Sequence, residues 1–172
     1  MTALTESLLV MARADANEFN VDSVLADIAQ IARRVVDQND ALATEKGIVL
    51  KVEANGQPAV ANVDVPAIRR LLLILIDNAL KHTPAGGVVT VSVQKSSGAI
   101  VLSVADTGEG ISPEALPHVF ERFYRSDPAR GDGSGFGLGL SIAQAIAQAH
   151  RTRITVESAP GAGARFSIAL KS

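Results

Sequence analysis

The sequence "AIRRLLLILIDNALKH", residues 67–82, is apolar almost all the way round when it is drawn as a helix. Such a pattern predicts a helix that lies deep in a core rather than on a surface. Pro66 stands just ahead of it, at an early helical position that proline tolerates, and Pro84 follows the last residue. We therefore expect this segment to be the central helix of a layered domain.

Strand-like and helical segments lie on both sides of the central helix. Helices are predicted at 21–45 and 138–150. Residues 55–57 suit a tight connection between the first two strand-like segments, while 95–98 and 159–163 are turns between later ones. The sum is an α/β domain in which helices cover one face of a mixed sheet, with strands predicted at 47–54, 58–64, 87–94, 99–106, 153–158 and 164–170.

Composition excludes several classes of protein. The 172 residues, 47% hydrophobic, fit one domain, and the absence of cysteine excludes disulfides and thiolate metal sites. A formal net charge of −2 offers no polybasic field for nucleic acid or an anionic membrane. No apolar run approaches the length of a bilayer span, and Glu6, Arg13 and Asp15 interrupt any signal peptide. We expect a soluble chain in which residues 4–15 form a short amphipathic helix as an appendage.

The stretch "GDGSGFGLGLS", residues 131–141, has glycine at every second position from Gly131 to Gly139. It lacks the lysine of a P-loop, the GxGxxG spacing of a dinucleotide site and the GxSxG pattern of a nucleophile elbow. One interpretation is a flexible linker that leads into a helix. The other is a set of backbone N–H groups that approach a polyphosphate at the positive end of the helix beginning near Leu138.

Polar residues break the apolar pattern at two other points. Asn78, Lys81 and His82 share one helical face, where an amide oxygen suits Mg²⁺ and an ammonium suits phosphate; the alternative is a helix end whose cations complement the dipole. In "VADTGEGIS", residues 104–112, Asp106 ends an apolar strand and could accept a hydrogen bond from an exocyclic amine such as that of adenine. The alternative there is a simple Asp-Thr-Gly turn.

Together and in this order, the motifs resemble the ATP-binding catalytic domain of bacterial sensor histidine kinases. "LILIDNALKHTP" is similar to the N box of that family, "DTGEGIS" to its first glycine box, "FERFYRSD" to its phenylalanine box and "GFGLGLSIAQAI" to its second glycine box. The resemblance covers nearly the whole chain. It implies an α+β fold, a two-layer sandwich with a mixed, mostly antiparallel sheet, about three helices on one face and a long ATP lid between 107 and 136.

The resemblance also implies roles for individual residues. Asn78 would bind Mg²⁺ and, with Lys81, serve the transfer, while His82 would contact phosphates or adenosine and Asp106 would recognise adenine. The residues bordering the base would be Gly108, Gly110 and Ile111. Those of the lid would be Phe120, Arg122, Phe123, Tyr124, Arg125 and Arg130. Those along the phosphates would be Gly135, Phe136, Gly137, Leu138, Gly139 and Leu140.

Two features depart from the family pattern. Ile74 stands four residues before Asn78, where such kinases usually carry a second asparagine and related ATPases a glutamate that activates water. Since isoleucine cannot take a proton, Ile74 argues against a hydrolysing ATPase and leaves open a nucleotide-binding or binding-dead regulatory scaffold without transfer activity. Arg151 and Thr152 stand where the family often has two glycines.

The resemblance further implies a function shared with segments outside this sequence. The chain would bind Mg²⁺-ATP and transfer the γ-phosphoryl group to a histidine of a phosphoacceptor domain, in two-component signalling with a response regulator. His82, His118 and His150 do not fit the acceptor pattern, so no autophosphorylation is expected from this piece alone. Residues 1–16 would be the remnant of the second helix of the dimerisation and phosphoacceptor domain, and 17–172 the catalytic domain. We expect a cytoplasmic location without membrane contact, a monomer as a fragment and a dimer in the full-length protein.

Overall fold

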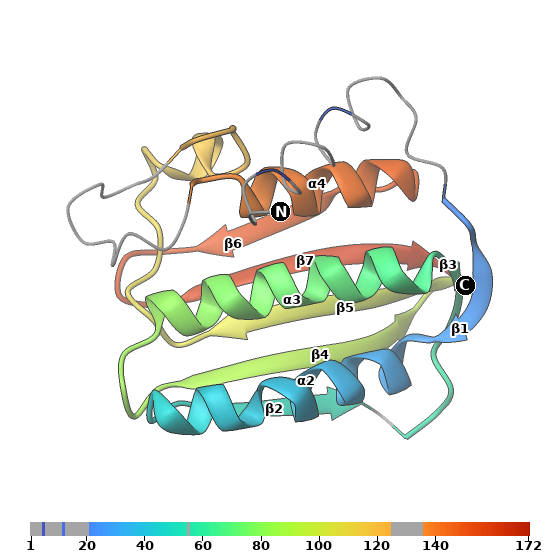
Figure 1. Ribbon diagram of the computed structural model, residues 1–172, viewed down its shortest axis with the longest axis horizontal. Helices are drawn as coiled ribbons and strands as arrows, with labels where there is room; N and C mark the ends of the chain where they lie inside the picture. The colour runs from blue at the N-terminus through green and yellow to red at the C-terminus, as the bar shows by residue number, and fades with distance from the viewer. Residues whose placement is uncertain (1–4, 6–11, 13–20, 55, 125–135) are drawn as a thin grey trace.

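A five-stranded sheet forms one layer of the molecule (Figure 1). The computed structural model describes residues 5, 12, 21–54, 56–124 and 136–172. The strand order is β2-β4-β5-β7-β6, and only the β2–β4 pair is parallel within this sheet. The expected mixed, mostly antiparallel sheet is therefore confirmed, with strands β2 (Val49–Ala54), β4 (Val88–Ser96), β5 (Ala99–Asp106), β6 (Ile154–Ser158) and β7 (Ala164–Lys171).

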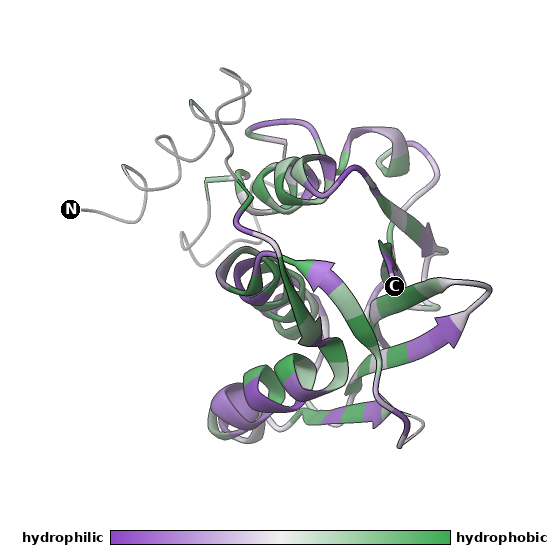
Figure 2. Cartoon of the chain, turned by 90° about the vertical axis from the view of Figure 1, so that its right-hand side faces the viewer, coloured by the Kyte–Doolittle hydropathy of each residue, from purple (hydrophilic) through white to green (hydrophobic). Residues whose placement is uncertain are grey.

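Helices α2 (Ile28–Glu45), α3 (Val65–His82) and α4 (Gly139–Ala149) cover one face of this sheet. Their apolar residues face the strands, and the view of Figure 2 places the helices together on one side of the sheet. Aspartates cap the first two helices: Asp27 accepts from the backbone N–H of Ala29, and Asp64 accepts from that of Ala67. No helix in the described part of the chain combines the length and apolar character that a membrane span requires.

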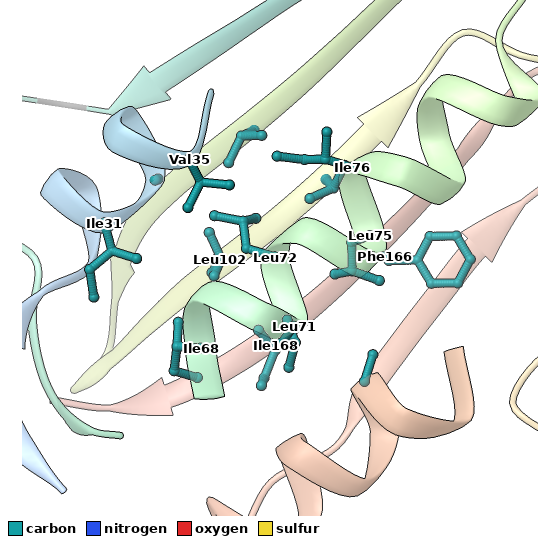
Figure 3. Close-up of a cluster of buried hydrophobic side chains, with 14 of the residues drawn as sticks. Ile31, Val35, Ile68, Leu71, Leu72, Leu75, Ile76, Leu102, Phe166 and Ile168 are labelled. Carbon is teal, nitrogen blue, oxygen red and sulfur yellow. The ribbon is translucent and has the colours of Figure 1, made fainter. Parts of the chain in front are cut away.

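The core lies between the two layers, and α3 is its centre (Figure 3). Leu71, Leu72 and Leu75 of α3 are fully buried, between side chains of α2 and those of the β5 and β7 strands. Phe166 of β7 packs edge-on against Phe120, with the ring centroids 6.1 Å apart. The prediction of a central helix is therefore confirmed.

The segment before α2 differs from its prediction. A helix was expected from residue 21, but Val24–Asp27 form strand β1, which pairs antiparallel with β3 (Val60–Val63) as a separate two-stranded sheet. The connection at 55–57 joins strands of two different sheets and is not a hairpin, because β2 pairs with β4 and β3 with β1. Both differences have one cause: long-range pairing partners decided the state of segments whose local pattern was ambiguous.

Five element ends meet at one end of the molecule. The chain leaves α3 and β5 there, turns from β6 into β7 there, and enters α4 there, at the left-hand end of Figure 1. The β1–β3 sheet lies at the opposite end. Residues as far apart in the sequence as His82 and Ala164 are thereby brought to one end of the fold.

Candidate functional site

Asp106 is the last residue of β5 and lies half-buried at this end. Its Oδ1 atom accepts hydrogen bonds from the backbone N–H groups of Gly108, at 2.8 Å, and Ala164, at 3.3 Å. Burial raises the pKa of the Asp106 carboxyl above its usual value, although the two N–H groups and the nearby His82 act in the opposite direction. Both bonds end on Oδ1, so they fix the direction of the carboxylate. Oδ2 takes part in neither bond.

The loop after Asp106 passes too close to other backbone for side chains. A Cβ atom at Gly108 would collide with the carbonyl oxygen of His82, and one at Gly110 with that of Ala159. Gly110 also has a φ of 74°, in the left-handed region that favours glycine. The two glycines thus let the loop backbone pack directly against the end of α3 and the β6–β7 turn.

The end of α3 presents the three polar residues that the sequence placed on one face. Asn78 is half-buried, while Lys81 and His82 are exposed. Lys81 pairs with Asp77, one turn earlier, at 2.7 Å, and His82 Nδ1 lies 3.1 Å from Glu109 Oε1. The backbone N–H of Glu109 also donates to the carbonyl of His82. The helix end and the glycine loop are therefore one connected unit.

The N-terminus of α4 faces the same region without a side-chain cap. Leu138 is the N-cap residue and is buried, and no acidic residue stands in the first turn. Uncapped N–H groups at the positive end of a helix favour an anion. A Cβ at Gly139 would lie 3.4 Å from Cγ2 of Ile74, so that Ile74 is the apolar neighbour of this helix start.

Phe123, within the predicted lid, and Gly137, just after it, meet beside α4. The backbone N–H of Phe123 donates to the carbonyl of Gly137 at 2.9 Å, and a Cβ at Gly137 would lie 2.9 Å from Phe123 Cα. Phe123 itself has a φ of 62°, which is uncommon for an aromatic residue, and its side chain is 62% exposed. Tyr124 is half-buried with its ring 5.6 Å from that of His118.

The remaining predicted residues fall into two groups. Phe120 and Ile111 pack partly buried against the core, Leu140 is half-buried, and Arg122 and Phe136 are exposed. Arg125, Arg130 and Gly135 lie outside the described residues, as does the greater part of the expected appendage helix at 4–15 and of the expected domain remnant at 1–16.

The β6–β7 turn also lies at the site, although the sequence predicted it only as a turn between strands. Ser158 Oγ accepts from the backbone N–H of Ile111 at 2.8 Å and donates to the carbonyl of Gly163 at 2.6 Å. The N–H of Gly161 donates to the carbonyl of Glu109 at 2.6 Å. The glycines of "APGAG" were the available signal, because they allow such a close approach.

These groups fit a magnesium nucleotide chemically. Asp106 can accept from an amine, the α4 N-terminus can accept an anion, and Lys81 can neutralise it. The described residues contain no group of three or more His, Cys, Asp or Glu side chains placed to hold a metal. A cation here would therefore take few ligands from protein, such as the Asn78 amide oxygen, and the rest from phosphate and water, as Mg²⁺ commonly does.

Several known proteins are similar to this chain. The family model described as "Histidine kinase-, DNA gyrase B-, and HSP90-like ATPase" matches residues 63–172. The probable sensor kinase SilS of Salmonella typhimurium is 35% identical over 163 residues, which cover 92% of this chain and 32% of SilS. The sensor histidine kinase CusS of Escherichia coli (strain K12) is 34% identical over 173 residues, which cover 99% of this chain and 35% of CusS. The chain thus spans about a third of the length of these relatives.

Solved structures show the same likeness. Full-length ShkA in complex with AMPPNP superimposes with a TM-score of 0.88 at 30% identity, over 98% of this chain and 35% of that chain. The catalytic domain of histidine kinase ThkA gives a TM-score of 0.76 at 20% identity, over 87% of this chain and 95% of that chain, which shows the fold alone. The chain belongs to the histidine kinase-, DNA gyrase B- and HSP90-like ATPase family and is homologous to sensor histidine kinases.

Proposed function

We propose that the chain binds Mg²⁺-ATP and presents its γ-phosphoryl group to a histidine on a phosphoacceptor domain, as the catalytic part of a two-component sensor kinase. The observation that carries the proposal is Asp106, which is half-buried at a strand end with one carboxylate oxygen engaged by two backbone N–H groups. Such a fixed acceptor beside a bare backbone surface suits the amine and the flat ring of adenine. The AMPPNP complex of the similar ShkA supports the same class of ligand.

Each residue of the site has a role in this proposal. Oδ2 of Asp106 accepts from the adenine amine, while Gly108, Gly110 and Ile111 border the ring. Lys81 exchanges its pairing with Asp77 for one with phosphate oxygens, and the N–H groups at the start of α4 bind the same phosphates. Bound Mg²⁺, held in part by Asn78, would neutralise charge on the transferring group. A lid closing over the phosphates would include Phe123, Tyr124, Arg130, Gly135 and Phe136.

The transfer itself asks little acid–base chemistry of the chain. A neutral imidazole of the acceptor is already a nucleophile, so that positioning in line with the γ-phosphate is the main contribution. The acceptor domain, of which residues 1–16 are proposed to be the remnant, and a response regulator would be the partners. The protein would be cytoplasmic and dimeric in its full length, with this chain alone a monomer that does not autophosphorylate.

Calorimetric titration with a non-hydrolysable ATP analogue tests the binding step. We expect binding that strengthens with Mg²⁺ and is lost in Asp106→Ala, with the fold of both proteins checked by circular dichroism. Incubation with ATP and a complete acceptor domain then tests the transfer, which should yield an acid-labile phosphohistidine. A folded parent protein that binds no analogue, or binds it equally well after Asp106→Ala, would contradict the proposal.

Ile74 favours a second candidate function, a regulatory scaffold that binds nucleotide without transferring phosphate, or that no longer binds it. The side chain is apolar and lies beside the start of α4. The asparagine of the family pattern would place a polar group there, close to the proposed phosphate site. The scaffold predicts that Ile74→Asn raises phosphotransfer strongly, because it returns an amide to this wall. Ile74→Val is the matched control. Equal transfer by the parent and by Ile74→Asn would count against the scaffold.

A further inference from the structure

The β6–β7 turn is bonded to the glycine loop after Asp106 at several points. Ser158 Oγ lies at the centre of this contact, with one bond to the backbone N–H of Ile111 and one to the carbonyl of Gly163. The N–H of Gly161 donates to Glu109, and the N–H of Ala164 donates to Asp106 Oδ1. These bonds close a ring that runs from Asp106 along its loop to Ile111, through Ser158 into the turn, and back to Asp106.

The ring leaves little freedom at either side of Asp106. A Cβ atom at Gly163 would collide with the carbonyl oxygen of Asp106, so the turn lies directly against the strand end. Ser158 is half-buried, and its hydroxyl uses both its donor and an acceptor lone pair in this ring. Ser158→Ala would leave the N–H of Ile111 and the carbonyl of Gly163 without these bonds at part-buried positions.

We infer that Ser158 is a positioning residue for base recognition, which fixes the loop of Gly108–Ile111 against the β6–β7 turn and so sets the direction of the Asp106 carboxylate. The inference rests on the proposed function, because it concerns the preference of the same nucleotide site for adenine over guanine. Ser158 does not touch the base in this scheme. It acts through Ile111 on one side and through Gly163 and Ala164 on the other.

The chemistry of the bases provides a readout specific to this role. Adenine presents an amine donor where guanine presents a carbonyl acceptor. A carboxylate in a fixed direction therefore accepts from adenine and repels guanine, while a carboxylate free to turn away discriminates less. Loss of Ser158 should reduce the ratio of ATP to GTP affinity, whereas simple destabilisation of the fold would lower both affinities together.

The experiment compares Ser158→Ala with Ser158→Thr and Thr155→Ala by titration with non-hydrolysable analogues of ATP and GTP. Ser158→Ala should lower the ATP:GTP affinity ratio about tenfold, the scale of one lost buried hydrogen bond. Ser158→Thr keeps the hydroxyl and should restore most of the ratio. Thr155→Ala is the matched control, because Thr155 lies on the same strand and its hydroxyl donates to Ser167 of β7, away from the glycine loop.

Hydrogen exchange gives a second measurement on the same variants. The amide of Ile111 should exchange faster in Ser158→Ala than in the parent, with no such change in Thr155→Ala. An unchanged ATP:GTP ratio in Ser158→Ala, with parent binding that still depends on Asp106, would overturn the inference and leave the proposed function intact. Absence of nucleotide binding by the folded parent would overturn both.

Discussion

At the scale of single residues, Asp106 combines partial burial, two backbone hydrogen bonds and a raised pKa. The sequence singled it out because a carboxylate ended an apolar strand before two glycines. Ala164, which donates to Asp106, and Ser158, which bonds the loop after it, lie more than 50 residues later in the sequence and carry no signal of their own. The sequence thus singled out Asp106 as a candidate acceptor, while the groups that orient its carboxylate could not be found from the sequence.

The two backbone bonds to Oδ1 predict the effect of Asp106→Asn. The amide oxygen can replace Oδ1, which leaves the NH₂ group at the position of Oδ2, where it would meet the adenine amine as donor against donor. We expect the affinity for an ATP analogue to fall at least about tenfold while the fold is kept, since a hydrogen bond to a charged group contributes about 1.5–3 kcal/mol. Titration calorimetry with circular dichroism as the control measures this.

The raised pKa of Asp106 predicts the pH dependence of the same binding. Burial favours the neutral carboxyl, so the folded state holds this proton more tightly than the unfolded chain does. The group therefore opposes folding most at neutral pH, and this cost disappears as the pH falls through the raised pKa. Affinity of the parent should decline over the same acidic range, beginning at a higher pH than for an ordinary aspartate, and affinity of Asp106→Asn should not. Parallel pH profiles for the two proteins would contradict the assignment.

At the scale of elements, α3 carries both the core and the polar end of the site. Its apolar pattern predicted burial on nearly all sides, and the structure places it between α2, α4 and the sheet. The pattern did not distinguish the side that faces outward. Leu72 is fully buried, but its neighbour Leu73 is 37% exposed, because outer coverage of a helix depends on which other helices flank it.

This difference gives a matched pair of variants. Leu72→Ala should lower the free energy of unfolding by about 2–5 kcal/mol, because it opens a cavity in the core. Leu73→Ala makes the same chemical change and should lower it by no more than about 1 kcal/mol. Urea unfolding followed by circular dichroism measures both. Equal losses would mean that α3 is oriented differently about its axis.

At the scale of the whole molecule, the site exists only because five element ends share one end of the fold. The contacts that join these ends are made between residues distant in the sequence: His82 with Glu109, Ile111 with Ser158, and Asp106 with Ala164. A ligand that contacts several of these elements at once binds the folded state alone and should raise the stability of the whole molecule.

Thermal unfolding can test this coupling. At an analogue concentration about 100 times its dissociation constant, with Mg²⁺ present, the stabilisation is about 2.7 kcal/mol. For a chain of this length that corresponds to a rise of about 5–10 °C in the unfolding midpoint. The rise should be smaller without Mg²⁺ and absent in Asp106→Ala. A similar rise in that variant would show that the analogue binds elsewhere.

The sequence by itself determined the central helix, the hairpins at β4–β5 and β6–β7, and the polar residues that stand at element ends. These features depend on apolar periodicity and turn residues, and both signals are contained within short segments of the sequence. Only the tertiary structure decided that Val24–Asp27 form a strand, that β2 lies parallel beside β4, and that Ser158 contacts the loop after Asp106. The physical reason is that strand pairing and loop contacts are made between residues distant in the sequence, whose local patterns do not name their partners.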